Sequence, residues 1–355
     1  MLAILTREIK NYLKRPLFWL GIAIVILGIY SQVSFYFSIR YLSPGETIVN
    51  DYPETIHAAD PNEGYIPATP EERRAFWETS IQEILVSPGF GLSSAEAAAV
   101  IDEMKNLTIS DACRYFDENY NFVGSARTYE LTKYRKGTSE EINAYLTEVL
   151  SQKPFSWYFS RKFADFAGLF MGFFATIMLS VLFIQDTRSY TYELLHTKPV
   201  SAGNYVAGKA LGGFAVCLIA LAILNLVFWA LCLIFTRGSG FEVRLNDFIR
   251  ATCIYILPNM LIIVCIYVLI ALLFKNPLPG VPLLSLFIVY SNMGGRNAEG
   301  VYGYYGRPLA IMVRFPGQFF DTAEPPMLLL NQSFLLAASA VILLISAQLW
   351  KRRRV

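Results

Sequence analysis

Long apolar runs alternate with polar blocks along this 355-residue chain. A helix that crosses a membrane needs about 20 apolar residues, and most of the runs reach that length. The pattern therefore predicts an all-α polytopic membrane protein with six transmembrane helices. We expect these helices at residues 17–37, 163–185, 206–236, 251–274, 278–292 and 327–350.

The fifth apolar run is short for a span and begins among three prolines, Pro277, Pro279 and Pro282. Proline lacks a backbone donor and favours an irregular helix start. The run therefore either continues past Asn292 or enters the membrane only part of the way. Counting it as a span gives an even number of crossings.

The first 16 residues predict a short amphipathic helix ahead of the first span. Its apolar and basic positions fall on separate faces, with Leu2, Leu5, Ile9 and Leu13 on one and Arg7, Lys10 and Lys14 on the other. Such a helix can lie in the headgroup layer, and Pro16 suits a bend into the span. We expect an interfacial elbow helix at 1–16; the alternative is a cytoplasmic extension of the first span.

The charged residues are few and unevenly distributed. The chain is 54% hydrophobic and 16% charged, where a soluble domain has about 25% charged residues. Residues 41–160 contain 19 acidic and 9 basic side chains, although the net charge of the whole chain is +2. Basic residues cluster before the first span and in the tail at 351–355, so the positive-inside rule makes both chain ends cytoplasmic.

This orientation assigns every loop to one side of the membrane. The block at 38–162 and the segment at 293–326 become external, and the loop at 186–205 becomes cytoplasmic. We expect a multi-pass protein of a bacterial plasma membrane. Only two histidines occur, and no C-x-x-C or H-E-x-x-H motif is present, so no metal site is expected.

The external block predicts a mostly helical domain. Its first part is rich in Pro, Gly and Asp and predicts an irregular, extended segment. Thr69, Pro70 and Glu72 then form a helix-start signature, and the helix should reach about Val86. Three further helices are expected, at about 93–106, 110–120 and 139–152. No carboxylates in this block have catalytic spacing, so they indicate a solvated face.

The stretch GNYVAGKA at 203–210 is close to a phosphate-binding loop. Gly203, Gly208 and Lys209 fit that motif, but Ala210 replaces the hydroxyl residue that holds Mg²⁺. No strand precedes the stretch, and it leads directly into the third apolar run, so we expect no ATP site here. Its glycines suit close helix packing, and Lys209 can extend from a span end towards the headgroups.

The residues just before this stretch predict a docking element. Tyr190 to His196 can form a short amphipathic helix between two spans, and Pro199 must end or turn it. A short helix under the membrane is a plausible contact for a soluble partner. The alternative is that Glu193 is an ordinary exposed carboxylate of a helix without a partner-binding role.

The whole stretch from Asp186 to Gly213 resembles the first cytoplasmic loop of type-2 ATP-binding cassette (ABC-2) permeases. The resemblance rests on Glu193-Leu194-Leu195, on Thr197-Lys198-Pro199-Val200-Ser201 and on Tyr205-Val206-Ala207-Gly208-Lys209. The segment from Arg7 to Trp19 is similar to the elbow helix of that family, and the span plan also fits. The long external block departs from the short first external loop of many members.

The resemblance implies a permease subunit without an ATPase site of its own. A separate cytoplasmic ATPase would bind ATP and Mg²⁺, so no cofactor is expected in this chain. The implied docking residues are Tyr190, Tyr192, Glu193, Leu194, Leu195, His196 and Lys198. A second permease subunit, identical or different, would face this one in the lipid membrane; no nucleic-acid partner is expected.

Polar groups within the apolar runs are further candidates. Asn225, Tyr255 and Asn259 either join helices or line a transport path. Arg161, Lys162 and Asp165 stand near the outer end of the second span and are expected to mark an interface. In the last external segment, Arg307, Arg314, Phe315 and Phe319 are expected to rest at the membrane surface as a re-entrant or surface helix.

Three functions remain open at this stage. The first is an exporter subunit for a peptide or another amphipathic molecule. The second is a mechanotransmission protein, in which ATP-driven motion acts on the external domain and nothing crosses the membrane. The third is a membrane receptor or scaffold. A membrane enzyme ranks last, because no nucleophile–base pair or metal-ligand set occurs.

Overall fold

The apolar runs form long helices. In the computed structural model, which describes residues 2–182, 201–296, 302–303, 307–315 and 317–352, five helical stretches have the length and apolar character needed to cross a membrane. These stretches are Pro16–Ser38, Phe155–Ser180, Ala202–Phe235, Leu245–Phe274 and Leu328–Arg352. The chain is therefore a polytopic, mostly helical membrane protein.

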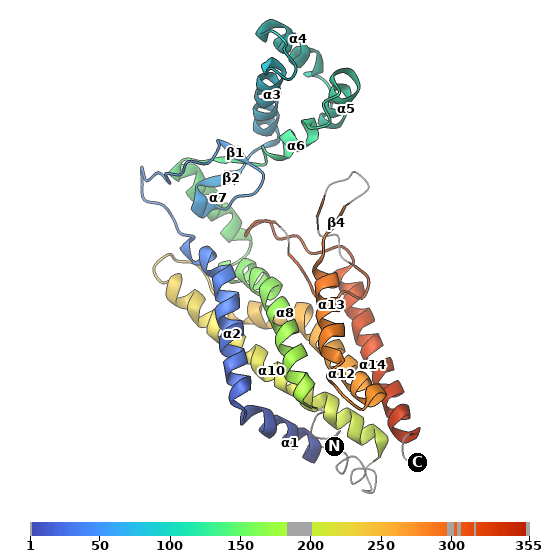
Figure 1. The fold of residues 1–355 in the computed structure, drawn as a ribbon. Helices are drawn as coiled ribbons and strands as arrows, with labels where there is room; N and C mark the ends of the chain where they lie inside the picture. The colour runs from blue at the N-terminus through green and yellow to red at the C-terminus, as the bar shows by residue number, and fades with distance from the viewer. Residues whose placement is uncertain (1, 183–200, 297–301, 304–306, 316, 353–355) are drawn as a thin grey trace. The chain divides into compact units, whose positions relative to one another are not determined.

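The chain divides into two units (Figure 1). The membrane unit combines Met1–Ser38 with Lys153–Val355, and the insert unit is Ile39–Gln152. We call the end of the membrane helices where the insert leaves and returns the insert end. We call the opposite end, where the N- and C-terminal residues lie in Figure 1, the terminal end.

The membrane unit begins with two helices joined at Pro16 and continues after the insert. Its elements are α1 (Leu2–Leu13), α2 (Pro16–Val33), the short 3-10 turn η1 (Ser34–Ser38), α8 (Phe155–Leu182), α10 (Ala202–Phe235), α11 (Leu245–Ala251), the π-helical turn η3 (Thr252–Ile256), α12 (Leu257–Phe274), α13 (Gly280–Asn292), the strands β4 (Gly295–Arg296) and β5 (Tyr302–Gly303), and α14 (Leu328–Arg352). Figure 1 shows α1 lying across the terminal end of the long helices.

Helix α12 lies at the centre of the membrane unit. It contacts α8, α10, α13 and α14, and its side chains are buried on all sides. A helix that is apolar all round is expected in such a position. The hydroxyl of Tyr267 on α12 donates a hydrogen bond to the carbonyl of Thr176 on α8, which links the two most buried helices.

Glycines set the distance between α2 and α8. A Cβ atom on Gly21 would come within 2.6 Å of the Phe174 ring, and one on Gly28 within 2.5 Å of the Phe170 ring. These separations are shorter than any ordinary carbon–carbon contact. The two glycines therefore let α2 rest directly on the aromatic face of α8.

Three predicted helix starts differ from the structure. Helix α8 begins at Phe155 rather than 163, the helical stretch of α11, η3 and α12 begins at Leu245 rather than 251, and α10 begins at Ala202 rather than 206. The insert unit accordingly ends at Gln152 rather than 162. The hydropathy pattern placed each start at the first residue of the apolar run. The helices begin earlier, in the polar residues that precede each run, because these residues have partners in the fold.

The fifth predicted span is the short helix α13. Its 13 residues extend about 20 Å at about 1.5 Å per residue, less than the apolar thickness of a bilayer, about 30 Å. The helix ends at Asn292, so the alternative of a helix that continues past this residue is wrong. Six complete spans stay a prediction.

The insert unit contains five helices and a small sheet. Its elements are β1 (Thr55–Ile56), the 3-10 turn η2 (Pro61–Glu63), β2 (Tyr65–Pro67), α3 (Pro70–Val86), α4 (Ser94–Met104), α5 (Ile109–Tyr120), α6 (Ser125–Glu130), β3 (Tyr134–Lys136) and α7 (Ser139–Gln152). The strands are antiparallel in the order β1-β3-β2. The unit is therefore mostly helical, as expected, but the small sheet and α6 were not predicted.

The helix starts of the insert follow the predicted capping signals. The Thr69 hydroxyl accepts from the Glu72 amide, and the Glu72 carboxylate accepts from the Thr69 amide. Helices α3, α4 and α5 enclose an apolar core around Trp77 and Phe116, and the indole of Trp77 donates to the Ser125 carbonyl over 2.9 Å. The insert thus has a hydrophobic core of its own.

Candidate functional site

The stretch that resembles a phosphate loop forms the start of α10 and packs against α1. Lys209 donates a hydrogen bond to Glu8 with 2.6 Å between Nζ and Oε1, and the two side chains are 4% and 8% exposed. The expectation that Lys209 extends towards the headgroups was wrong. A carboxylate on the neighbouring helix provides a nearer counter-charge.

Two glycines make this contact possible. A Cβ atom on Gly212 would lie 2.8 Å from Glu8 Cβ, and one on Gly208 would lie 3.2 Å from Ile4 Cβ. Small residues allow two helices to approach closely. Gly208 and Lys209, which suggest nucleotide binding in the sequence, therefore serve together with Gly212 as a seat for α1.

Aromatic contacts fix the terminal end further. The Tyr12 hydroxyl of α1 donates to the Met178 carbonyl of α8 over 3.2 Å. The Tyr205 ring of α10 stacks on Trp350 of α14 with 4.0 Å between centroids. The start of α10 is therefore held by α1 and α14, so a displacement there must also displace these helices.

The most buried residues of α1 are Glu8 and Tyr12, which do not belong to the predicted apolar face. Leu2 of that face is 72% exposed. The helix thus turns Glu8 and Tyr12 towards the bundle, whereas Leu5, Ile9 and Leu13 stay half-buried. This arrangement suits a helix with lipid on its outer side.

At the insert end, α8 carries three charged residues that hold a distant segment. Lys162 donates to the carbonyls of Phe315 and Gly317 over 3.0 and 2.6 Å. Asp165 forms an ion pair with Arg314. We call residues 307–327, which precede α14, the strap.

Arg161 provides the third attachment of the strap. It donates to the Thr322 carbonyl over 2.7 Å and to the Glu324 carboxylate over 2.8 Å. Its guanidinium also lies 3.7 Å from the centroid of the Trp157 ring. The Tyr255 hydroxyl donates to the same Glu324 carboxylate over 2.6 Å, so Glu324 joins α8, η3 and the strap.

The predicted surface placement of the strap was wrong for its aromatic residues. Phe315 and Phe319 are buried, and Phe319 packs among the rings of Phe155, Tyr158 and Phe159. No helix occurs in the described residues 307–315 and 317–327. The reason is that Lys162 and Asp165 are buried and need partners, which the strap backbone and Arg314 provide.

One polar pair in the spans links two helices, and a second polar contact lies within a single helical stretch. The Thr252 hydroxyl donates to Asn225 Oδ1 over 2.9 Å and thereby joins η3 to α10. The side-chain amide of Asn259 donates to the Tyr255 carbonyl one turn earlier over 2.6 Å. The amide oxygen of Asn259 is buried and has no partner among the described residues.

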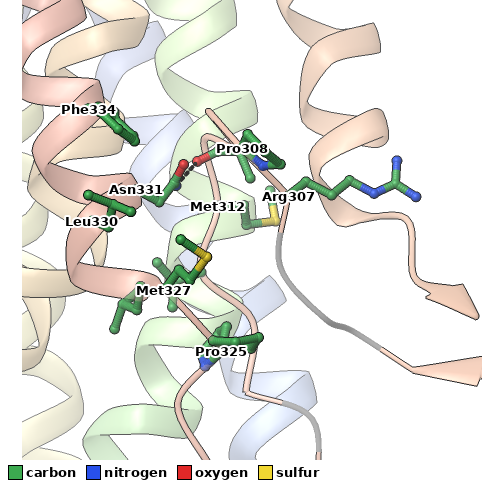
Figure 2. Close-up of a pocket in the computed structure, with 12 residues that line it drawn as sticks. Arg307, Pro308, Met312, Pro325, Met327, Leu330, Asn331 and Phe334 are labelled. Atoms are coloured by element: carbon green, nitrogen blue, oxygen red, sulfur yellow. Dashed lines mark hydrogen bonds between the residues drawn. The ribbon is translucent and has the colours of Figure 1, made fainter. Parts of the chain in front are cut away.

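Two cavities flank residues 324–331, where the strap meets α14. The polar cavity has a volume of about 190 Å³ and is lined by Trp157, Ser160, Arg161, Asp247, Arg250, Ala251, Ile254, Tyr255, Glu324 and Leu329. The apolar cavity has a volume of about 160 Å³ (Figure 2). Figure 2 shows Met312, Met327 and Leu330 around it, and the Asn331 side chain donating to the Ala310 carbonyl over 2.9 Å.

The geometry just described fits a membrane permease: apolar helices joined by buried polar pairs, with cavities at one end. The family model for ABC-2 family transporter proteins matches residues 2–301. The chain belongs to the ABC-2 transporter family. It is the membrane component of an ABC transporter and works with an ATP-binding cassette ATPase, since members of this family lack an ATPase site.

Neither the curated proteins nor the solved structures contain a match to this permease. Among the residues that the structure describes, no group of three or more His, Cys, Asp or Glu side chains is arranged to hold a metal ion.

The predicted ATPase-docking residues lie outside the described residues. They are Tyr190, Tyr192, Glu193, Leu194, Leu195, His196 and Lys198. The described chain resumes at Ser201, whose hydroxyl accepts from the Asn204 amide and caps α10. Only four residues separate His196 from this cap, so the predicted docking element and the seat of α1 are close in the sequence.

Sequence reasoning missed two acidic residues at the site. Glu8 is the one carboxylate among the basic residues of α1, and Glu324 directly precedes Pro325-Pro326. The signal for Glu8 was its spacing of four residues from Tyr12 on one helical face. Glu324 gave no such signal, because its partners lie on α8 and η3, far away in the sequence.

Proposed function

We propose that the chain is the permease subunit of an ABC exporter that moves a peptide or another amphipathic molecule. The observation that carries this proposal is the pair of cavities beside residues 324–331, one with four charged residues in its lining and one with a mainly apolar lining. A molecule with a polar and an apolar part needs both kinds of surface. ATP and Mg²⁺ would be bound by the separate cytoplasmic ATPase.

The proposal includes an orientation. Both chain ends would be cytoplasmic and the insert unit external, as the distribution of basic residues favours. The insert end would then be the outer end of the spans, and α1 would lie in the inner headgroup layer. Labelling of a single cysteine at the exposed Ser94 position with a membrane-impermeant reagent tests this; labelling only after lysis would contradict it.

The proposed power stroke enters at the loop before α10. Residues Tyr190 to Lys198 would dock in the ATPase, with Glu193 pairing to a basic residue there and Leu194 and Leu195 filling an apolar cleft. Motion of this loop would reach α10 within a few residues and pass to α1 through Lys209 and Glu8. Two permease subunits, identical or different, would form the path.

Reconstitution with the partner ATPase tests the transport function. We expect ATPase activity that rises with the substrate, and ATP-dependent uptake into inverted vesicles. The Glu193→Arg variant should lose this stimulation and keep the helical content of the parent. A variant with unchanged coupling would contradict the docking role, and ATP turnover by the purified permease alone would contradict the division of labour.

A second candidate is force transmission to the insert unit without transport. The observation in its favour is the short connection between α7, which ends at Gln152, and α8, which begins at Phe155. Motion of α8 would therefore be conveyed to the insert with little slack. ATP hydrolysis that is independent of every amphipathic substrate, with no vesicle uptake, would favour this function over export.

A further inference from the structure

The polar cavity at the insert end is lined by one exposed cation, Arg250, that is not used to hold the fold. Four charged residues line it: Arg161, Asp247, Arg250 and Glu324. Arg161 and Glu324 pair with each other. Asp247 accepts a hydrogen bond from the Ser156 hydroxyl over 2.5 Å. Among the described residues, Arg250 has no hydrogen bond or ion pair.

The four charges of the lining sum to zero, and within the part of the chain that the structure describes Arg250 is the one of them whose hydrogen-bonding groups remain available to a ligand. The Glu324 carboxylate is engaged twice, by Arg161 and by the Tyr255 hydroxyl at 2.6 Å. The Asp247 side chain lies one helical turn before Arg250, yet no ion pair joins them within 4.0 Å in the structure. Arginine is well suited to phosphate and carboxylate because its planar fork donates two parallel hydrogen bonds.

The remaining lining is apolar and aromatic. Ile254, Leu329 and Ala251 contribute aliphatic surface, and Trp157 contributes an indole. The volume of about 190 Å³ is more than ten times the roughly 10–15 Å³ that a single buried water needs. This is enough space for a phosphate or carboxylate group and the first carbons attached to it.

We infer that this cavity binds the anionic head of an amphipathic ligand, with Arg250 as the residue that contacts the phosphate or carboxylate. The first carbons of the ligand lie against Ile254 and Leu329, and its chain continues into the membrane. Arg161 has a positioning role, since Trp157 and Glu324 fix it at the cavity wall. An anionic amphipathic molecule is then the substrate class of the exporter, and this step rests on the proposed export function.

Calorimetric titration of the full chain in phosphatidylcholine nanodiscs tests the inference without ATP or the ATPase. The probes are octyl phosphate, octyl trimethylammonium and inorganic phosphate, each corrected with empty nanodiscs. We expect saturable binding of octyl phosphate, and binding at least tenfold weaker for each of the other two probes. Equal binding of the cationic probe would overturn the anionic class, and equal binding of inorganic phosphate would overturn the amphipathic class.

The variants locate the binding group. Arg250→Gln should weaken octyl phosphate binding by about tenfold or more, since a charged hydrogen bond contributes about 1.5–3 kcal/mol. Arg244→Gln is the matched control, because Arg244 is exposed, pairs with Glu242 and does not line the cavity. Its affinity should equal that of the parent. Unchanged affinity in Arg250→Gln, with an unchanged melting temperature, would overturn the assignment.

The assay also separates this inference from the proposed function. If the permease binds octyl phosphate but transports nothing, the result supports the binding site and contradicts the export function. A permease that exports a substrate and does not bind octyl phosphate would keep the function and contradict this site.

Discussion

Removal of one partner of the Glu8–Lys209 pair gives the sharpest test of the terminal end. The two charges are 2.6 Å apart, so their gross attraction is about 6 kcal/mol at an effective dielectric constant of about 20. Burial of both ions costs a similar amount, which leaves a small net gain from the intact pair. In Lys209→Met, however, the Glu8 carboxylate stays buried without its partner, and this costs about 3–5 kcal/mol.

Thermal unfolding of the purified permease, followed by circular dichroism, measures this cost. A loss of this size should lower the melting temperature by roughly 10 °C, given about 2–4 °C per kcal/mol for chains of this class. Lys10→Met is the control on the same helix, because Lys10 is exposed, and it should change the melting temperature by at most a degree or two.

Charge reversal separates the ion pair from general packing. The double variant Glu8→Lys with Lys209→Glu restores opposite charges and should recover more than half of the loss seen in either single reversal. The reasoning is refuted if Lys209→Met has the same melting temperature as the Lys10→Met control. It is also refuted if the double reversal is no more stable than the single reversals.

Three further predictions concern other parts of the chain. The hydrogen bond from Arg135 lowers the pKa of Glu141 to about 2. The ionised Glu141 therefore stabilises the fold fully above about pH 4.3, and this contribution is lost as the pH falls towards 2. Glu141→Gln should lower the free energy of unfolding by about 1 kcal/mol at pH 7 and by less at pH 2. Gly212→Ala adds a Cβ that meets α1 at 2.8 Å and should lower stability by about 1–3 kcal/mol. Thr252→Val should cost about 1–3 kcal/mol, because Asn225 then keeps a buried acceptor without its donor.

The same thermal unfolding assay measures all three, each with a matched control. Glu140→Gln changes a neighbouring carboxylate that Arg135 does not contact, and Gly203→Ala adds a Cβ with no atom within 4 Å. Thr79→Val removes an exposed hydroxyl that bonds only within its own helix. A variant with the same melting temperature as its control would contradict the stabilising role of the corresponding contact.

Local signals in the sequence were sufficient for the helices of the insert. The Thr69 capping box and the Ser93 cap depend only on residues three positions apart, and both helices begin where these caps predict. The strands gave no such signal, because each has two or three residues and its partner lies elsewhere in the chain. Alternation of apolar and polar residues cannot be recognised over so few positions.

Hydropathy predicted the long helices but not the roles of charged residues near their ends. Lys162 and Asp165 read as interfacial groups, because a buried charge is costly in a membrane. Their partners on the strap are about 150 residues away in the sequence, so only the folded chain reveals them. The same limit applies to Lys209 and Glu8, which are 201 positions apart.

Helix α8 has a mechanical consequence that follows from its continuity. One uninterrupted helix of 28 residues covers about 42 Å at about 1.5 Å per residue, from two residues after the insert to the segment that leads towards residue 190. It carries the anchors of the strap near one end and the acceptor for Tyr12 near the other. Because one continuous helix carries both sets of contacts, a rotation imposed at its terminal end must also move the strap, whose Glu324 lines the polar cavity, at its insert end.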